Sequence, residues 1–385
     1  MRKEPETPET AVIGPYRPQL LEPERFELTM ENGRITDVKI ERGYVNRGIE
    51  KLFTTKTYMQ NLALAERVCG ICSGVHSLCY AQTAEGIMQV TVPDRAKFLR
   101  SIYMELERLH SHYLWFAVLA HSLHKQEIFL RIMAERDQLQ NLMEYLTGNR
   151  KNYGINSIGG VRRDITREKE AKIAELFTNM ETLSEYLLSL IDDNGILTKE
   201  IKGLGILTGE QAQSLGVVGP VARASGLKRD TRRDDPYVAY EELDFEVISE
   251  KDGDVYSRSL VRAKETVESI NIIEQALSNI PTGDIAAKPE EPLERESICR
   301  VEAPRGELFY YMRSNGTNIP ERVKVRTPSF ANNPALIEML KGELLENART
   351  VIESIDPCFA CTDRVTVLES ETGHKVLLLD EEGRS

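Results

Sequence analysis

Most of the chain carries the hydrophobic spacing of amphipathic helices. One apolar stripe begins near Asp94 and recurs at steps of three and four residues, at Phe98, Ile102, Leu106, Leu109, Tyr113 and Phe116. This spacing predicts a long helix that starts at Asp94. Further helices are predicted over 126–146, 166–191, 256–278 and 334–354, the last with a proline in its first turn. Long helices with short connections favour a bundle.

Strand-like segments flank the helical region. Apolar and polar residues alternate on both sides of Asn32-Gly33, which predicts a β-hairpin near the N-terminus. Short strands are expected at 297–301, 306–313 and 322–325, after a loop rich in proline and acidic residues, and two more strand-like runs surround Gly373. The predicted fold class is therefore α+β: mainly a helical bundle, with an N-terminal β-hairpin region and a small C-terminal β region.

Composition narrows the class of protein. The 385 residues are 41% hydrophobic, enough for a large core. A net charge of −12 argues against a nucleic-acid binder, which needs a basic face. No apolar run approaches the roughly 20 residues that cross a bilayer, and the charged, proline-rich residues 1–12 are expected to be a disordered lead-in, not a signal peptide. We expect a cytoplasmic protein that reaches a membrane only through partner subunits.

Two Cys-x-x-Cys pairs carry the candidate chemistry. Cys69 and Cys72 lie near one end of the chain, and Cys358 and Cys361 lie near the other. Without an export signal, metal or redox chemistry is favoured over disulfides. Four thiolates from two such turns make a soft, four-sulfur site, for which zinc, an iron–sulfur cluster or a rarer metal are open alternatives. Cysteine pairs this far apart in the sequence can meet only in the folded protein, which is unusual for a structural zinc site.

The surroundings of both pairs resemble the paired signatures of nickel–iron hydrogenase large subunits. Arg67-Val68-Cys69-Gly70-Ile71-Cys72 is followed by His76, and Asp356-Pro357 precedes the second pair. Five further segments look like this family: Gly14-Pro15-Tyr16-Arg17-Pro18, Gly43 to Glu50, Gly159 to Asp164, Gly219 to Gly226 and Ala303 to Gly306. The resemblance covers most of a domain over 13–364. It points to the energy-converting, membrane-bound branch, which is related to the 49 kDa-type, quinone-site subunit of complex I.

The resemblance implies a hydrogenase that interconverts H₂ with protons and electrons by heterolytic cleavage at a nickel–iron centre. Cys69 and Cys358 would bind nickel terminally. Cys72 and Cys361 would bridge nickel to an iron that carries carbon monoxide and cyanide. Pro328 and Ser329 resemble the pocket that holds these diatomic ligands, although a strand that simply ends at a Pro-Ser turn is the plainer interpretation.

Four more residues receive roles through the resemblance. Arg305 would lie over the open metal position, and Asp356 would hold it there. Glu22 would pass protons from a terminal cysteine, because a buried carboxyl can have a raised pKa. His76 would hydrogen-bond a cysteine sulfur. The plainer alternatives are a surface salt bridge, a turn cap, an exposed acid and a satisfied core histidine. The helix histidines, His110, His112, His121 and His124, are interpreted as helix-face residues, and Cys79 and Cys299 as inert thiols.

Two departures from the family pattern stand out. Arg17 occupies a position where this branch has histidine, which leaves local details of the proton path open. Arg364 replaces a histidine that, with a glutamate matching Glu50, helps bind a magnesium or iron ion, so that ion site is in doubt.

The resemblance also implies that a maturation protease removes residues 365–385 after Arg364. Until then the tail would hold Cys358 and Cys361 away from the first pair. The alternative is that this C-terminal extension stays as a permanent hairpin.

The implied partners follow from what the sequence lacks. It has no further cysteine groups for electron-carrying clusters, so electrons would leave through a hydrogenase small subunit that carries an iron–sulfur cluster. The energy-converting branch implies ferredoxin as the distal redox partner, reached through other subunits, and membrane subunits that translocate ions. Two other hypotheses remain. One is a complex-I-like subunit without nickel that shapes a pocket for a quinone or a sulfur compound, and the other is a zinc-stapled interaction protein.

Overall fold

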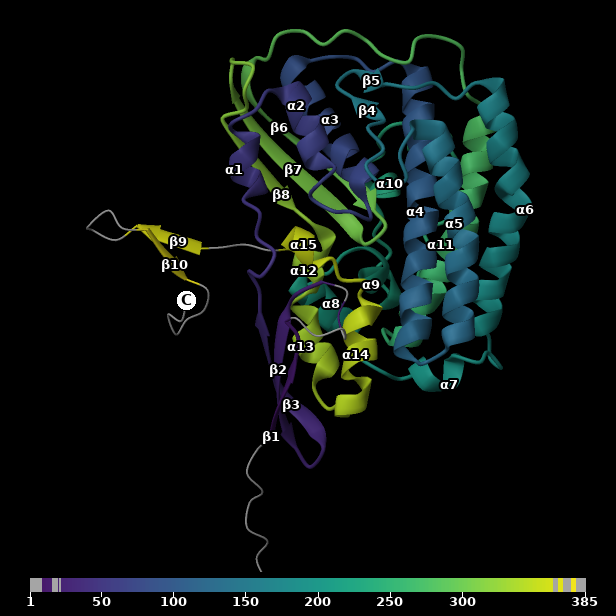
Figure 1. The fold of residues 1–385 in the computed structure, drawn as a ribbon, viewed down its shortest axis with the longest axis vertical. Helices are drawn as coiled ribbons and strands as arrows, with labels where there is room; N and C mark the ends of the chain where they lie inside the picture. Colours follow the sequence, from purple (N-terminus) through teal and green to yellow (C-terminus); the bar gives the residue numbers. More distant parts are fainter. Residues whose placement is uncertain (1–8, 16–19, 21, 363–365, 370–374, 379–385) are drawn as a thin grey trace, which may run out of the picture.

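Four long helices form one side of the molecule in the computed structural model, which describes residues 9–15, 20, 22–362, 366–369 and 375–378. They are α4 (Asp94–Ser122), α5 (Gln126–Thr147), α6 (Arg167–Leu190) and α11 (Val255–Ser278), and they stand side by side (Figure 1). α4 packs against both α5 and α11, and α6 packs against α11 and α5. Both ends of α5, α6 and α11 were predicted within one residue, and the start of α4 was predicted at Asp94. Thr166 caps α6, because its side chain accepts a hydrogen bond from the amide of Lys169.

A three-stranded antiparallel sheet forms the second part of the fold. It contains β6 (Glu294–Ala303), β7 (Gly306–Asn315) and β8 (Arg322–Arg326), in that order. β6 and β7 are longer than predicted because they stay paired without a break from Glu294–Asn315 to Ala303–Gly306. Three helices, α1 (Ile49–Phe53), α2 (Tyr58–Ala65) and α3 (Ser73–Met88), lie beside the sheet, and α3 packs directly on β6 and β7.

The N-terminal β region has three strands, one more than predicted. β2 (Arg25–Glu31) and β3 (Arg34–Glu41) pair antiparallel across Asn32-Gly33, whose positive φ angles suit a tight hairpin turn. β1 (Glu9–Ile13) pairs with the free edge of β2. The expected disordered lead-in is therefore wrong for residues 9–12, since backbone pairing and β-branched side chains at 10, 12 and 13 hold them as a strand. Residues 1–8 lie outside the described part.

The helix predicted over 334–354 is two helices. α13 (Ala335–Leu340) ends before Gly342, whose φ is +85°, and α14 (Leu345–Ser354) begins after it. The amide of Gly342 donates to the carbonyl of Ile35, and the amide of Ile35 donates to the carbonyl of Glu343. This pairing with β3 competes with helical hydrogen bonds and breaks the helix, which the spacing of apolar residues alone did not reveal.

The remaining elements are short. They are β4 (Asn156–Ser157), β5 (Gly160–Val161), α7 (Thr198–Ile201), α8 (Gly209–Leu215), α9 (Gly219–Ala224), α10 (Thr231–Asp234), a 3₁₀ helix (Tyr240–Glu242), α12 (Pro328–Asn332) and α15 (Phe359–Thr362). β9 (Thr366–Glu369) and β10 (Lys375–Leu378) pair as the expected C-terminal hairpin, and Figure 1 shows this hairpin beside the body of the molecule.

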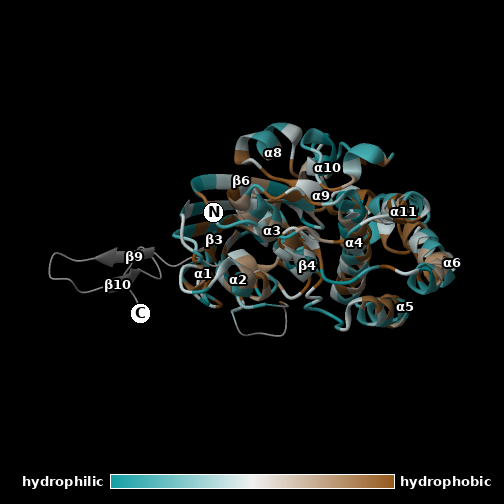
Figure 2. Cartoon of the chain, turned by 90° about the horizontal axis from the view of Figure 1, so that it is seen from above, coloured by the Kyte–Doolittle hydropathy of each residue, from teal (hydrophilic) through white to brown (hydrophobic). Residues whose placement is uncertain are grey.

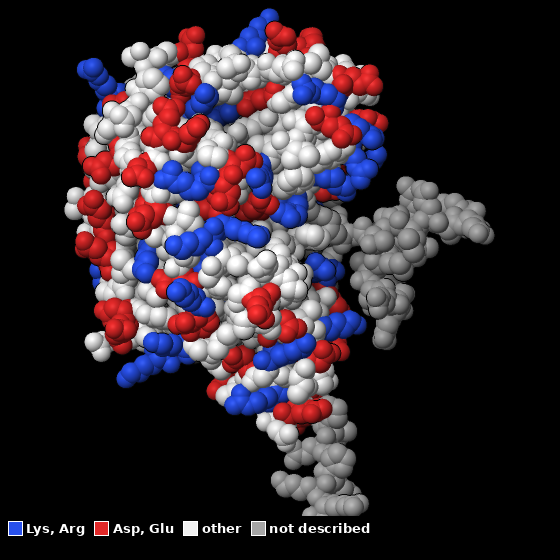
Figure 3. Space-filling view, turned by 180° about the vertical axis from the view of Figure 1, so that it is seen from behind, with Lys and Arg blue, Asp and Glu red and all other residues white. Residues whose placement is uncertain are grey.

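Two hydrophobic clusters fill the interior. The larger joins α3, α4, α5, α6 and α11 to the sheet of β6, β7 and β8, and the smaller joins the N-terminal strands to α13 and α14. Figure 2 shows hydrophilic and hydrophobic residues side by side on the long helices, as amphipathic helices require. On the face shown in Figure 3, acidic and basic side chains are interspersed. None of the described helices has the length and apolar character needed to cross a bilayer.

A buried network of charged side chains crosses this interior. Glu105 on α4 accepts hydrogen bonds from Arg108, Arg232, Tyr240 and Ser269, all within 3.3 Å. Burial alone would raise its pKa, but the two guanidinium groups outweigh that effect and lower it to about 2. Because each charge has partners, the network ties α4 to α10 and α11 without leaving an isolated ion in the core.

Gly219 and Gly306 hold the start of β7 against α9. The φ angle of Gly219 is +66°, and a Cβ atom there would lie 2.3 Å from the Cα of Gly306 and 2.4 Å from the carbonyl oxygen of Arg305. The chain at Arg305 can reach its position only because both residues lack a side chain.

We expect Gly219→Ala to lower the free energy of unfolding by about 2–4 kcal/mol, from backbone strain plus overpacking. Gly203→Ala is the matched control, because its φ is +80° and nothing lies within 4 Å of the position that a Cβ would occupy; it should lose only about 1 kcal/mol. Urea unfolding of the purified subunit measures both changes. Equal losses in the two variants would contradict the role of close packing at Gly219.

Candidate metal centre

The fold brings the two cysteine pairs together. Cys69 lies in the turn before α3 and Cys72 is the N-cap of that helix, whereas Cys358 lies just before α15 and Cys361 lies within it. The sulfur atoms of Cys358 and Cys69 are 3.3 Å apart. All four side chains are buried, with at most 4% of their surface exposed. Residues 289 positions apart in sequence therefore meet in the core.

Hydrogen bonds among these thiols shift their pKa values in different directions. The thiols of Cys358 and Cys72 donate to Cys69, which lowers the pKa of Cys69 well below its usual range. Hydrogen bonding to Cys69 and burial raise the pKa of Cys72. Hydrogen bonds to Cys361 and Cys69 likewise raise the pKa of Cys358. The cluster thus favours one thiolate, which the amides of Ile71 and Cys72 face at 3.4 and 3.5 Å.

The donor set suits a soft metal, although the sulfurs make pairwise contacts in this structure. In the described part of the chain, no three side chains of histidine, cysteine, aspartate or glutamate are already arranged around one ion position. Four buried sulfurs from two short turns are nevertheless a donor set that fits nickel, iron or zinc and suits hard cations poorly.

Arg47 ties the two cysteine loops to each other. Its guanidinium donates to the carbonyl oxygens of Arg67 and Val68, which precede Cys69, and to that of Ala360, which precedes Cys361. The last two bonds are each 2.8 Å long. One planar, five-donor side chain can satisfy carbonyls from both loops at once. The family resemblance covers Arg47 but assigned it no role.

Arg305 lies beside the cysteines and is held from two sides. Its Nε donates to the carbonyl of Asp356 and its Nη2 to the Asp356 carboxylate, both at 2.7 Å, while Nη1 donates to the hydroxyl of Ser111 at 3.3 Å. Burial raises the pKa of Asp356 even though Arg305 opposes this effect. Asp356 therefore orients Arg305, and both residues are buried. Ser111, which lies on the face of α4 opposite the apolar stripe, was not predicted.

Glu22 approaches the second cysteine pair from the N-terminal segment. Its Oε2 accepts a 2.7 Å hydrogen bond from the amide of Ala360, and its Oε1 lies 4.0 Å from the sulfur of Cys358. Burial raises the pKa of Glu22, partly offset by the bond from Ala360. The carboxyl is thus beside a thiol, in a setting where it can take up a proton more readily than an exposed glutamate.

The segment that begins α12 contacts both cysteines of the second pair. The amide of Cys358 donates to the hydroxyl of Ser329 at 3.0 Å, and the hydroxyl of Thr327 donates to the carbonyl of Cys361 at 3.0 Å. Pro328 starts the helix between them. Ser329 accepts in this bond, so its own proton is available to another acceptor.

Three buried histidines, His76, His110 and His112, lie within hydrogen-bond distance of neighbouring side chains. The Nδ1 atom of His76 lies 3.0 Å from the hydroxyl of Tyr310, which orients this ring. Burial lowers the pKa of His76 to about 4, which keeps it neutral. His110 pairs with Tyr153 and Arg136, and His112 pairs with Glu265. His110 and His112 thus connect α4 to α5 and α11.

Glu50, expected near a magnesium or iron ion, is paired with a lysine side chain in this structure. The carboxylate of Glu50 binds the ammonium of Lys324 at 2.6 Å and the amide of Val325 at 3.0 Å. Lys324 already supplies one positive charge there. Arg17 and Arg364, the two departures from the family pattern, lie outside the described residues.

Glu107 is a buried carboxyl that was not predicted from the sequence. It accepts hydrogen bonds from the amides of Gly74 and Val75, each 3.1 Å long, at the N-terminal end of α3 just behind Cys72. Burial raises its pKa well above the usual range. Glu107 lies outside the apolar stripe of α4, so the spacing of apolar residues gave no signal of its burial.

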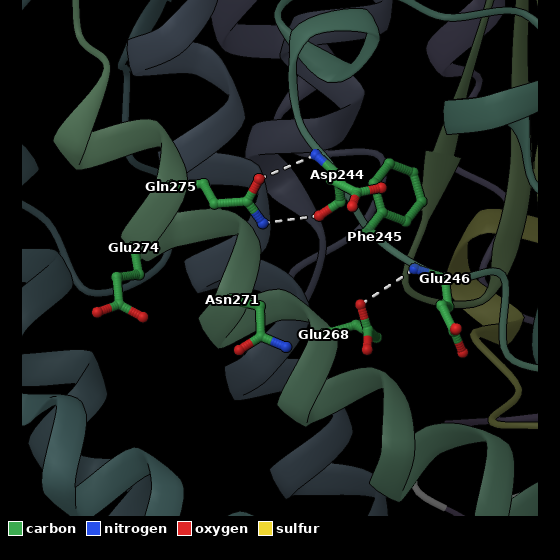
Figure 4. A pocket seen from close by; sticks show the side chains of 7 residues that line it. All are labelled: Asp244, Phe245, Glu246, Glu268, Asn271, Glu274 and Gln275. Carbon is green, nitrogen blue, oxygen red and sulfur yellow. Dashed lines mark hydrogen bonds between the residues drawn. The ribbon is translucent and has the colours of Figure 1, made fainter.

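Two cavities differ in their relation to this centre. One, of about 230 Å³, is lined by Glu22, Arg305 and Asp356 together with Lys151 and Glu353. Another, of about 380 Å³, lies between α11 and the segment 244–246, and Figure 4 shows Gln275 bonded there to the backbone of Asp244 and Glu268 bonded to that of Glu246. None of the four cysteines lines either cavity, but Glu22, which lies beside the sulfur of Cys358, lines the first one.

Comparison with known proteins identifies the family. Residues 47–182 match the family described as nickel-dependent hydrogenase. Residues 124–295 and 288–364 match the 49 Kd subunit of respiratory-chain NADH dehydrogenase. The chain belongs to this combined family of nickel-dependent hydrogenase large subunits and 49 kDa-type complex I subunits.

The relatives include proteins of both kinds. The carbon monoxide-induced hydrogenase of Rhodospirillum rubrum is 38% identical, over 92% of this chain and 99% of its own. The membrane-bound hydrogenase subunit alpha of Pyrococcus furiosus is 34% identical, over 96% and 90%. An NADH-quinone oxidoreductase subunit of Clostridium beijerinckii is 34% identical, over 92% and 97%.

A solved structure extends the comparison to three dimensions. A chain of the archaeal membrane-bound sulfane sulfur reductase superposes with a TM-score of 0.87 at 30% identity, over 93% of this chain and 98% of its own. The fold is thus that of an energy-converting hydrogenase or complex-I-like subunit. Because the family contains several reactions, the particular activity has to be argued from the site.

Proposed function

We propose that this chain is the catalytic subunit of an energy-converting nickel–iron hydrogenase, which interconverts H₂ with protons and electrons. The observation that carries the proposal is the meeting of Cys69, Cys72, Cys358 and Cys361 in one buried cluster beside Arg305. Two hydrogenases among the relatives support the same conclusion.

The four thiols would hold the metals. In this proposal Cys69 and Cys358 would hold nickel, and Cys72 and Cys361 would hold both nickel and an iron that carries carbon monoxide and cyanide. When bound, this group supplies a soft, electron-rich centre that polarises H₂ for heterolytic cleavage. Ser329, beside Cys358, would have its hydroxyl proton free to donate to a cyanide nitrogen, and Pro328 is buried next to it.

The surrounding side chains position charge and move protons. Asp356 and Ser111 fix the guanidinium of Arg305 at the cluster, where its positive charge stabilises negative charge that develops on the substrate. The carboxyl of Glu22 accepts a proton from Cys358, because it lies beside that sulfur and has a raised pKa. The buried walls keep bulk water away and strengthen both interactions.

Electrons and ions require partners in this proposal. The chain has only two cysteines beyond the cluster, Cys79 and Cys299, so electrons would pass to a small subunit that carries an iron–sulfur cluster. Ferredoxin would be the distal partner, reached through other subunits. Membrane subunits would couple the reaction to ion translocation, and they would hold this chain peripherally on the cytoplasmic membrane.

The second candidate is a nickel-free subunit that shapes a pocket for a quinone or a sulfur compound. The similarity to NADH-quinone oxidoreductase and sulfane sulfur reductase subunits favours it. The four gathered thiols favour the hydrogenase, because a pocket for an organic substrate needs no four-sulfur donor set.

Metal analysis of the purified complex separates these candidates. We expect nickel and iron in the wild-type subunit, and loss of both nickel and H₂ activity in Cys358→Ser, because a serine oxygen is a poor ligand for nickel in a sulfur site. Cys299→Ser is the control and should keep both. Zinc alone, no metal at the cysteines, or full H₂ activity in Cys358→Ser would each contradict the proposal.

The planar guanidinium of Arg305 gives a second prediction. Arg305→Lys keeps the positive charge but loses the fork that binds Asp356 and Ser111 together, so we expect unchanged nickel content and an H₂ oxidation rate lower by about 100-fold. Arg313→Lys, which affects an exposed pair with Glu321, serves as the control. An unchanged rate in Arg305→Lys would remove this residue from the reaction.

The proposal includes removal of residues 365–385 by a maturation protease between Arg364 and Val365. One part of the expectation from the sequence is wrong: with the tail present, Cys358 already touches Cys69, so the tail does not hold the pairs apart. Its described strands pair with each other as a separate hairpin.

Intact-mass spectrometry of the nickel-containing subunit tests this cleavage. We expect a mass that corresponds to residues 1–364, because a hairpin that carries its own hydrogen bonds can leave without unpairing the body of the fold. Unprocessed, nickel-free protein provides the reference mass. An active subunit that still ends at Ser385 would show that the hairpin is permanent.

A further inference from the structure

We propose that Glu353 is a proton-relay residue, which takes up protons inside the cavity beside the cysteine cluster and releases them toward solvent. This inference rests on the proposed hydrogenase function and extends it to a residue outside the family motifs. Glu353 lies near the end of α14, three residues before Asp356.

The cavity supplies the path. It measures about 230 Å³, and Glu353 lines it together with Glu22, Arg305, Asp356 and Lys151. A cavity of this size with five charged side chains in its wall has the room and the polar partners that ordered water requires. Lys151 is exposed whereas Glu353 and Arg305 are buried, so the cavity extends from buried groups next to the cysteine cluster toward the surface. Protons can therefore move along water between these groups.

Glu353 itself is unusually placed for a carboxylate. Only 4% of its surface is exposed, and its Oε1 atom is buried without a hydrogen-bond partner. The nearest cationic atom is the Nε of Arg349, at 3.7 Å on the same helix, too long for a hydrogen bond. An ionised carboxylate with no donor is costly in such a place, so the protonated form is stable there.

Several charged groups around Glu353 affect the stability of its protonated form. Arg349 on α14 opposes protonation, and Asp356 favours it through like-charge repulsion. Arg262 on α11 and Arg305 before β7 face Asp356, while Glu22 and Lys151 lie across the cavity. Burial is the largest influence, and with the repulsion from Asp356 it raises the pKa of Glu353 to about 7 although Arg349 opposes this effect. The residue can thus exist in both forms at neutral pH, as a relay requires.

Glu353→Gln keeps the shape of the side chain but cannot exchange a proton. We expect its D₂/H⁺ exchange and H₂ turnover to fall by at least about 10-fold, with nickel content unchanged. Conversion of para-H₂ to ortho-H₂ should change far less, because H₂ cleaved and re-formed at the centre needs no proton release to solvent. Glu353→Asp should restore part of the exchange.

The matched control is Glu346→Gln, on the exposed first turn of the same helix, which should behave as wild type. In the wild-type enzyme, H₂ oxidation should rise as pH increases through about 7, where Glu353 becomes able to accept a proton. That limb of the pH profile should disappear in Glu353→Gln. A variant with wild-type exchange and an unchanged pH profile would overturn the inference.

Infrared spectroscopy provides a readout that does not depend on turnover. The intact complex should show the C=O band of a protonated carboxyl that disappears as pH rises through about 7 and is absent in Glu353→Gln but present in Glu346→Gln. Absence of this band from wild type would also overturn the inference, even if Glu353→Gln failed to load metal. A complex without nickel or H₂ activity that still showed the band would instead count against the hydrogenase assignment alone.

Discussion

The structure depends on one constraint: thiols from the two ends of the chain must meet in a buried place. Cys69 and Cys358 have their sulfurs 3.3 Å apart, and each is carried by a short turn before a helix. The N-terminal turn is held by α3 against the sheet of β6 and β7. The C-terminal turn follows α14 and is hydrogen-bonded to Ser329 and to Arg47. The guanidinium of Arg47 also donates hydrogen bonds to the N-terminal turn. The long helices and the sheet are the frame that keeps these two turns at a fixed distance.

Burial then sets the chemistry of the groups around the cluster. Water is excluded, so each carboxyl takes a pKa decided by its particular partners. Glu105, surrounded by guanidinium groups, keeps its charge. Glu353, with its closest cation 3.7 Å away, becomes easy to protonate. Asp356 lies between these extremes, because burial raises its pKa while Arg305 lowers it. The same apolar environment thus produces a structural ion network in one region and proton-accepting groups in another.

The family contains hydrogenases and subunits with other electron acceptors on one fold. Similarity over nearly the whole chain therefore establishes architecture more firmly than reaction. In this chain the four cysteines support the proposed hydrogenase function, because two loops from opposite ends of the chain bring them together. The guanidinium of Arg305 and the carboxyl of Glu22 line the same cavity. Metal content is the property in which the candidate functions differ most.

The sequence by itself determined the long helices, the hairpins and the four cysteines, because these depend on local periodicity, turn residues and motif spacing. Resemblance to a family added Arg305, Asp356 and Glu22. Only the tertiary structure decided which groups touch. β3 breaks the helix before α14, Tyr310 orients His76, Ser111 binds Arg305 and Glu107 binds the start of α3. Glu353 lines the cavity that Arg305 also lines. These depend on contacts between segments 30 to 300 residues apart. Whether such a side chain is buried, and with which partner, is a property of the packed core that local sequence does not encode.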